Sequence, residues 1–297
     1  MVPARITGQN DQQFCLEQAL DCDPRFAITR AYAPKQSMSA VVALYALVAS
    51  LEKMLCEVSD ETVFQAKWAW WRQELLGRHS QDSHHPITRQ LHRTGCMQRW
   101  RSADLQHLLE GFERRRDPVA PTDVQQFIMQ CEEAGRYPMI LELQLGDHAA
   151  TSQLDEVLTA MAVTGGLFRL LRESSRGTGQ SYWWLPMNLL ARFGISRGEL
   201  LAQPDGPGRQ ALVTKAMDLA LGYRDRWEQG LVGSSAQPDE IRRWKLSHRH
   251  WLAQSVSMGR CLARLRTLPL SQHRAALCSS RAGDVWAVWR NLKKLSV

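Results

Sequence analysis

Hydrophobic residues recur every three or four positions along most of this 297-residue chain, a spacing typical of amphipathic α-helices. The segment 37–56 has the clearest pattern. Its apolar face is formed by Ala43, Leu44, Leu47, Val48, Leu51 and Leu55. Strict alternation of apolar and polar residues, which would indicate strands, is nearly absent. The pattern therefore predicts an all-α protein.

Proline, glycine and capping residues predict where the helices begin and end. Asp23-Pro24 starts a helix that Pro34 interrupts, and Asp60 begins a helix that Gly77 ends. Further helices are expected at 11–21, 87–98, 101–115, 123–146 with a kink near Pro138, 154–173, 209–229 after a small helix pair, from Pro238 to about 265, and 282–294. No internal repeat and no long linker divides the chain, so we expect one domain over 1–297.

The charge and the cysteines narrow the setting in which the protein works. Its 37 basic and 30 acidic residues give a net charge of +7, which favours acidic partners such as diphosphates or an anionic membrane surface. No nucleic-acid-binding motif is present, so we expect no nucleic-acid partner.

Seven scattered cysteines without a C-x-x-C pair indicate free thiols in a reducing compartment. No apolar run approaches about 18 residues, and no secretory signal is visible. We expect a cytoplasmic protein that could still associate peripherally with a membrane.

Eight blocks occur in a characteristic order along nearly the whole chain. They lie at 23–26, 33–34 (Ala-Pro), 43–47 (Ala-Leu-Tyr-Ala-Leu), 67–72, 85–86 (His-Pro), 166–173, 184–186 and 285–290. In this order they resemble the squalene/phytoene synthase family of head-to-head prenyl transferases. The resemblance implies the isoprenoid synthase fold, an all-helical domain around a central cavity.

Two further blocks resemble a non-synthase branch of that family. They are Val58-Ser59-Asp60, before the tryptophan-rich helix, and Trp184-Leu185-Pro186-Met187. This branch includes the mitochondrial complex I assembly factor with a phytoene-synthase-like domain. The resemblance therefore implies an assembly role as well as a fold.

Active members of the family carry two pairs of aspartates, each pair four residues apart, that hold magnesium and diphosphate. The resemblance places these positions on Glu52 and Cys56 in the first segment, and on Glu173 and Gly177 in the second. Magnesium prefers oxygen ligands, so a thiol and a glycine replace the second aspartates poorly. We expect the usual metal cluster to be lost, with magnesium bound only if the protein is a divergent enzyme.

The same resemblance implies a ligand site formed by Tyr45, Glu52, Arg169, Arg172 and Glu173. The two arginines lie three residues apart on one helix face, where they could grip a diphosphate or pair with acids. The two glutamates could be remnants of the metal site or structural partners of arginines. We favour the structural interpretation of the glutamates and leave both interpretations of the arginines open.

Other residue groups also have two interpretations. The tryptophans at 68, 70, 71, 183 and 184 could line a cavity, although helix packing explains each one more simply. Arg114-Arg115-Arg116 could complement a helix dipole or contact an anionic membrane. His84, His85 and His92 have no cysteine partner at zinc spacing, so we expect no zinc site there.

Three functions remain open from the sequence. The first is a catalytically degenerate family member that acts as an accessory or assembly factor, binding a protein partner or an isoprenoid or other lipid-like ligand. The second is a divergent prenyl transferase that condenses prenyl diphosphates head to head with Glu52 and Glu173 and fewer metal ions. The third is an interaction module whose cavity is filled by side chains. The missing second acid of each pair favours the first.

Overall fold

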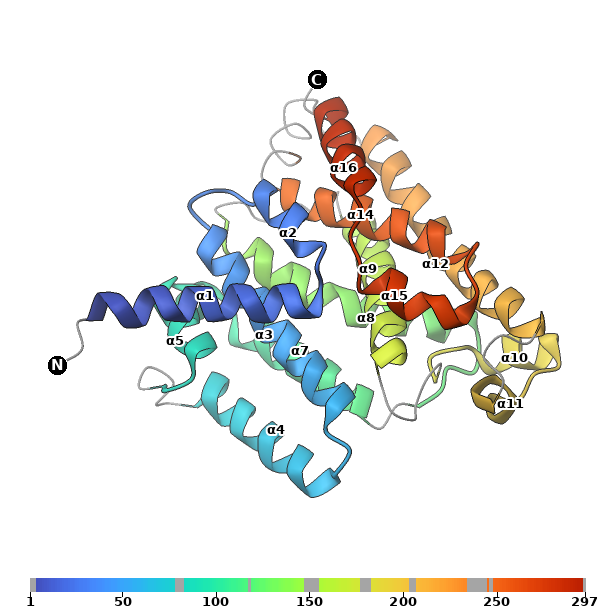
Figure 1. Ribbon diagram of the computed structural model, residues 1–297, viewed down its shortest axis with the longest axis horizontal. Coiled ribbons are helices and arrows are strands. Elements are labelled where there is room, and N and C mark those ends of the chain that lie inside the picture. Colours follow the sequence, from blue (N-terminus) through green and yellow to red (C-terminus); the bar gives the residue numbers. More distant parts are fainter. Residues whose placement is uncertain are drawn as a thin grey trace.

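The computed structural model describes residues 4–77, 83–116, 119–146, 155–176, 183–202, 207–233, 245 and 248–295. Within these ranges every regular element is an α-helix or a short 3-10 helix (Figure 1), so the all-α prediction is confirmed. Residues 177–182, which include Gly177, lie outside the described residues, as does Pro238.

The N-terminal half is organised around one buried helix, α3. The elements of this half are α1 (Ala4–Cys22), α2 (Phe26–Thr29), η1 (Arg30–Tyr32), α3 (Met38–Glu57), α4 (Glu61–Leu76), α5 (Pro86–Arg93), α6 (Cys96–Arg99) and α7 (Ser102–Arg116). Helices α1, α5, α7, α8 and α9 all contact α3, whose apolar face forms the centre of a core cluster. Asp60 caps α4 as predicted, since its carboxylate accepts the Val63 N–H at 2.9 Å.

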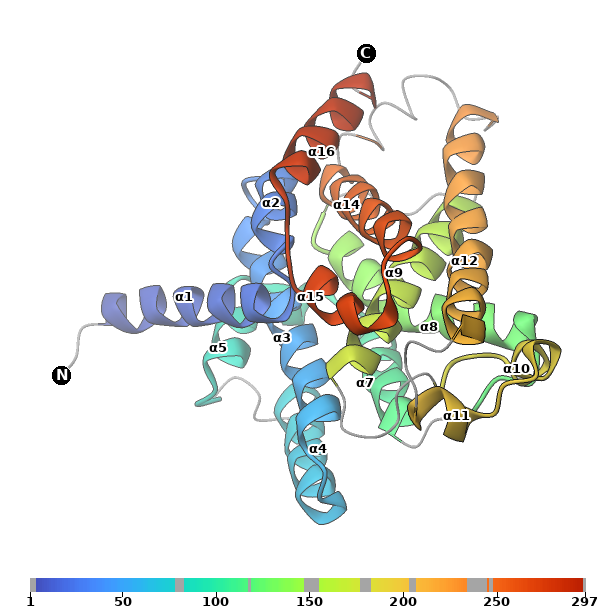
Figure 2. The ribbon, with the colours of Figure 1, turned by 45° about the vertical axis from the view of Figure 1, so that its right-hand side comes forward.

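The C-terminal half surrounds α9 in the same way. Its elements are α8 (Val124–Leu143), α9 (Asp155–Arg176), α10 (Met187–Phe193), α11 (Arg197–Ala202), α12 (Pro207–Gly233), α14 (Arg249–Leu265), η4 (Leu270–Gln272), α15 (His273–Leu277) and α16 (Ala282–Leu295). Helices α8, α12 and α14 pack against α9 and bury its apolar face in a second core cluster (Figure 2).

Glycines allow α8 and α9 to approach each other closely. A Cβ atom on Gly135 would overlap the carbonyl oxygen of Ala162, and one on Gly166 would overlap the carbonyl oxygen of Cys131. Because only glycine lacks a Cβ atom, the two backbones can touch at these positions. Helix α8 also continues through Pro138 to Leu143. The space between α8 and α9 is therefore closed by backbone contact.

Several predicted boundaries were wrong for local reasons. Helix α1 starts at Ala4 rather than at 11. The segment 87–98 forms two helices because Gly95 adopts a left-handed φ of 75° between them. The short elements η4 and α15 were not predicted, because a segment of three to five residues carries too little periodicity to detect.

One described helix, α3, is long and apolar enough to cross a membrane by length and composition alone. Within the fold, 72% of its most apolar window is buried against other helices. The core of a globular domain passes the same test, so the length of α3 does not indicate a membrane span.

Candidate functional site

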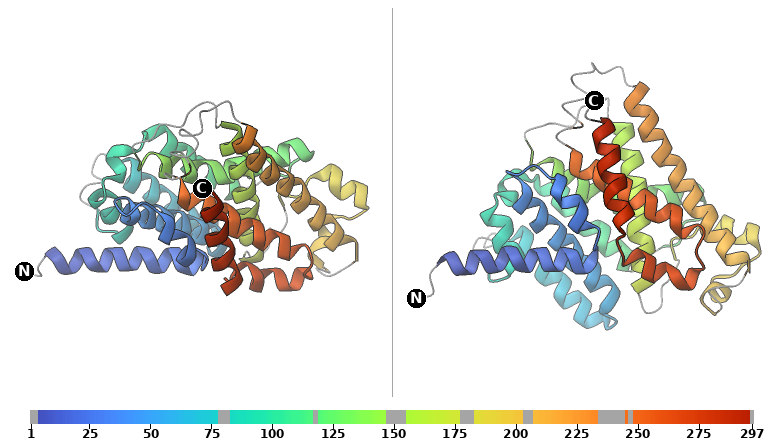
Figure 3. Two further views of the ribbon diagram at one scale, coloured as in Figure 1. Left: turned by 90° about the horizontal axis from the view of Figure 1, so that it is seen from above. Right: turned by 45° about the horizontal axis from the view of Figure 1, so that its top comes forward.

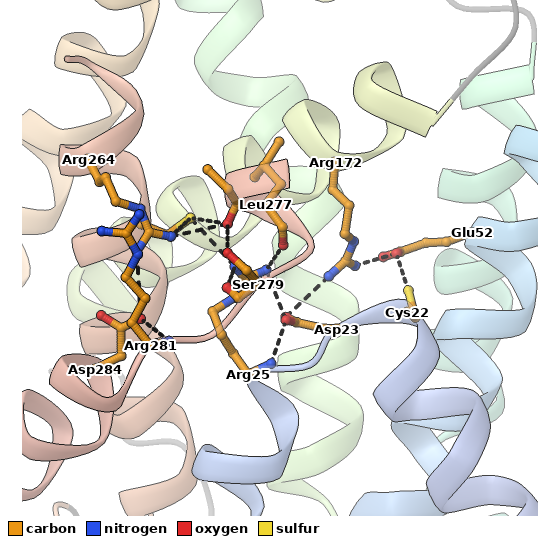
Figure 4. Close-up of polar contacts among 12 residues, drawn as sticks. Cys22, Asp23, Arg25, Glu52, Arg172, Arg264, Leu277, Ser279, Arg281 and Asp284 are labelled. Atoms are coloured by element: carbon orange, nitrogen blue, oxygen red, sulfur yellow. Dashed lines mark hydrogen bonds and ion pairs between the residues drawn. The ribbon is translucent and has the colours of Figure 1, made fainter. Parts of the chain in front are cut away.

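Helices α3 and α9 bring three of the five predicted ligand residues into direct contact. Glu52 lies on α3, and Arg169 and Arg172 lie on the facing side of α9. Arg169 Nη1 donates to Glu52 Oε1 at 2.5 Å. Arg172 Nη2 donates to Glu52 Oε2 (Figure 4). All three residues are buried. We call this group, together with Cys22, the Glu52 cluster.

Cys22, at the end of α1, completes the Glu52 cluster. Its thiol donates to Glu52 Oε2 at 3.1 Å. Both carboxylate oxygens of Glu52 therefore accept hydrogen bonds from side chains of this chain, and one oxygen accepts two. A buried carboxylate is stable only when it is paired and hydrogen-bonded in this way.

Two residues next to α1 extend the Glu52 cluster across the molecule. Arg172 Nη1 lies 3.2 Å from Asp23 Oδ2, and Arg25 Nη2 lies 2.9 Å from Asp23 Oδ1. Arg25 also donates to the carbonyl of Leu277 at 2.7 Å (Figure 4). The chain of contacts therefore joins the α1–α2 turn to α3, α9 and the end of α15. In the sequence, Asp23 is part of a helix-start signal and of the 23–26 block of the resemblance, but nothing in the sequence indicates that Arg25 is buried.

The two arginines determine the charge state of Glu52. Burial alone would raise its pKa, but the positive charges of Arg172 and Arg169, with the Cys22 hydrogen bond, outweigh burial and lower the pKa to about 2. The pKa of Arg172 is shifted in the opposite direction. Burial would lower its pKa, but nearby acidic groups, above all Cys22, Glu52 and Asp23, hold it well above its ordinary value. Glu52 and Arg172 are therefore both ionised at neutral pH.

Acidification is expected to remove the contribution of Glu52 to stability. The folded pKa of about 2 lies below the ordinary value of 4.5. The stabilisation, about 3 kcal/mol, is therefore complete above pH 4.5 and lost as the pH falls towards 2. Urea unfolding of wild type and Glu52→Gln from pH 7 to pH 2 should show the gap in unfolding free energy narrowing in that window. A gap independent of pH would contradict the assignment.

Glu173 is paired with a different arginine from those that contact Glu52. Arg115 Nη1 on α7 pairs with Glu173 Oε1, and the Cys56 thiol lies 3.9 Å from the Glu173 backbone carbonyl. Burial, together with the charge of Glu52, raises the pKa of Glu173 despite the arginines around it. The two glutamates thus lie on facing helices, as the resemblance implies, but each is already paired with arginine.

Tyr45 belongs to a separate polar group. Its hydroxyl lies 2.9 Å from both Glu142 Oε2 and Gln254 Oε1, and His250 Nδ1 lies 2.7 Å from Glu142 Oε1. Burial, followed by the charge of Glu142, raises the pKa of Tyr45 well above its ordinary value. Tyr45 and Arg169 line the same small cavity among α3, α8, α9 and α14. This cavity has a volume of about 20 Å³, which is enough for about one water molecule.

The residues present do not fit a magnesium cluster. The oxygens of Glu52 are occupied by guanidinium and thiol donors, and Glu173 is paired with Arg115. Cys56 offers sulfur, which magnesium binds poorly. Among the described ranges, no group of three acidic, histidine or cysteine side chains is placed to hold a metal ion. Gly177, the remaining predicted position, has no side chain to contribute.

Several of the other residues singled out from the sequence have structural contacts. Trp68 and Trp184 are buried in the two core clusters. Each of the three arginines at the end of α7 is paired with an acid: Arg114 with Glu133, Arg115 with Glu173, and Arg116 with Glu61. His85 caps α5 by accepting the Ile87 N–H.

Comparisons with known proteins agree with this architecture. A search of curated proteins finds no match. Among solved structures, squalene synthase HpnC from Alicyclobacillus acidocaldarius is 15% identical, with a TM-score of 0.62 over 89% of this chain and 97% of that one. A dehydrosqualene synthase in complex with ligand is also 15% identical, with a TM-score of 0.69 over 97% of this chain and 96% of that one. The isoprenoid synthase fold is therefore confirmed.

The family itself is established by sequence. The model of the squalene/phytoene synthase family matches residues 20–267, a span that contains both α3 and α9 and therefore the whole Glu52 cluster. Because the match covers most of the chain, this protein belongs to the squalene/phytoene synthase family.

Proposed function

We propose that this protein is an accessory or assembly factor built on a synthase fold, and that it does not condense prenyl diphosphates. The observation that carries the proposal is the Glu52 cluster. The acid at the first metal-binding position is enclosed by Arg169, Arg172 and Cys22. A synthase needs this carboxylate open to metal ions.

The Glu52 cluster opposes both magnesium binding and diphosphate binding. Magnesium would have to displace two guanidinium groups from Glu52, and a diphosphate would have to draw the same groups away from it. Removing one partner from a buried ion pair costs about 3–5 kcal/mol, because a buried charge is left without compensation. The arrangement therefore favours a closed, ionised interior over a site that accepts metal and substrate.

The size of the cavity beside Arg169 favours a protein partner over an isoprenoid ligand. Its volume is about 20 Å³, and that of the cavity beside Arg115, the partner of Glu173, is about 160 Å³, whereas sites for organic ligands usually measure about 300–1,000 Å³. The glycine-mediated backbone contact between α8 and α9 opposes widening of the cavity beside Arg169 on that side. The resemblance to the complex I assembly factor makes a subunit of a respiratory complex the first partner to test.

The alternative, a divergent prenyl transferase, is supported by the placement of Glu52 and Glu173 on facing helices. An assay of diphosphate release distinguishes the two. Farnesyl diphosphate and magnesium are incubated with the protein, and lipid products are extracted, with a dehydrosqualene synthase as positive control. We expect neither released diphosphate nor a condensed product. Release that is lost in Glu173→Gln would establish the enzyme instead.

A further inference from the structure

Helix α16 has two faces of opposite character. Its inner face packs against the domain, because Val288 and Leu292 join a core cluster with Trp251. Asp284 also forms an ion pair with Arg260, with 3.2 Å between Asp284 Oδ1 and Arg260 Nε. The helix lies at the edge of the molecule beside α14 and next to the C-terminus (Figures 2 and 3). It is thus held firmly while one side faces outward.

The outer face of α16 exposes large apolar side chains. Val285 is 48% exposed, Trp286 is 56% exposed and Trp289 is 50% exposed. With 3.6 residues per turn, these three side chains, Arg290 and Lys293 lie within an arc of about 140°. A single exposed tryptophan is ordinary, but large apolar side chains exposed together on one helix face mark an interaction surface.

Each exposed tryptophan is accompanied by a cation. Arg290 Cζ lies 5.1 Å from the centroid of the Trp286 ring, and Lys293 Nζ lies 5.0 Å from that of Trp289. From Arg249 to the C-terminus the sequence contains nine Lys and Arg residues and a single acid, Asp284. Asp284 is turned inward, towards Arg260 and Arg264. The outward charge of this region is therefore positive.

Tryptophan beside lysine and arginine on one helix face matches the chemistry of a bilayer surface. The indole ring prefers the headgroup region, and the cations attract anionic lipids. Tryptophan and arginine are also enriched in protein–protein interfaces, but lysine is depleted there, and Lys293 lies beside Trp289. We propose that α16 docks this protein on an anionic membrane, with Trp286 and Trp289 in the interface and Arg290 and Lys293 at the headgroups. This inference is independent of the proposed accessory function.

Sedimentation with vesicles tests the membrane-docking proposal. The full-length protein is mixed with vesicles of phosphatidylcholine alone, or of phosphatidylcholine and phosphatidylglycerol. Binding is expected only to the anionic vesicles, and it should weaken as salt is raised because the attraction is screened. The double variant R290E/K293E should bind at least about twentyfold more weakly, since each basic residue contributes about fivefold. W286A/W289A should bind at least about tenfold more weakly, because the two indole rings that insert into the interface are removed.

Substitutions on α4 provide matched controls, because its outer face also exposes a tryptophan and a lysine. Trp70 is 41% exposed, and Lys67 is exposed. Trp70→Ala and Lys67→Glu should leave vesicle binding unchanged, and circular dichroism should show that all variants remain folded. The proposal is overturned if wild type does not bind anionic vesicles, or if the α16 variants bind as well as wild type. Concentration-dependent dimerisation that W286A/W289A abolishes, without vesicle binding, would assign the face to a second copy.

Discussion

Glu52→Ala is expected to destabilise the protein by about 3–5 kcal/mol, although the residue carries out no chemistry in this account. The substitution leaves Arg169 and Arg172 buried, with Asp23 as the remaining acid within ion-pair distance of Arg172. An uncompensated buried charge costs far more than a lost surface ion pair. Urea unfolding followed by circular dichroism at pH 7 measures the loss.

Glu57→Ala is the matched control for Glu52→Ala. Glu57 lies on the same helix, α3, but is exposed to solvent. Its removal should change the free energy of unfolding by no more than about 0.5 kcal/mol. Equal effects of the two substitutions would show that Glu52 is not held in a buried ion-paired cluster.

Gly166→Ala is the second substitution with a large expected effect. The added Cβ atom would lie 2.6 Å from the carbonyl carbon of Cys131 on α8, and closer still to its oxygen. Because both sides of this contact are backbone, relief requires the two helices to move apart. Overpacking of this kind costs about 1–3 kcal/mol, occasionally more, and we expect the upper part of that range. Thermal unfolding should show the loss as a lower Tm.

The neighbouring residue provides a control with the opposite expected sign. A Cβ atom on Gly165 would meet only the Met258 sulfur, at 3.9 Å, which is an ordinary contact. Alanine also favours a helix over glycine by about 0.8–1 kcal/mol. Gly165→Ala should therefore leave the Tm unchanged or raise it. A Gly166→Ala variant as stable as Gly165→Ala would contradict the close packing of α8 against α9.

Sequence periodicity predicted the helices that position the site. The apolar spacing in 37–56 corresponds to α3, and that in 154–173 corresponds to α9. The same spacing correctly placed Arg169 and Arg172 on one face of their helix. These features depend on local chain geometry, which a single sequence expresses directly.

The structural interpretation anticipated arginine partners for the two glutamates, but local spacing could not predict which arginine meets which glutamate. Arg169 and Arg172 meet Glu52 only because α3 and α9 approach each other, and Arg115 reaches Glu173 from α7. Such pairings join residues far apart in the chain, and no local pattern encodes them. Arg25 shows the limit most clearly, because an arginine with 1% exposure looks like a surface residue in the sequence.

Helix α16 illustrates a related limit. Val285, Trp286, Val288 and Trp289 all contribute to the apolar character that predicted the helix, but only Val288 of these is buried. Valine and tryptophan satisfy the helical period equally well inside a core or on an interaction surface. Which side faces inward depends on α14 and on the ion pairs of Asp284, which are tertiary features.

Calorimetric titration of farnesyl diphosphate into the protein, with and without magnesium, tests the central claim that the Glu52 cluster closes the family's metal site. If both oxygens of Glu52 stay engaged by Arg169, Arg172 and Cys22, magnesium cannot bridge this carboxylate to a diphosphate. The account predicts either no binding heat or a heat that is the same in both conditions. Binding that appears only when magnesium is present would contradict it.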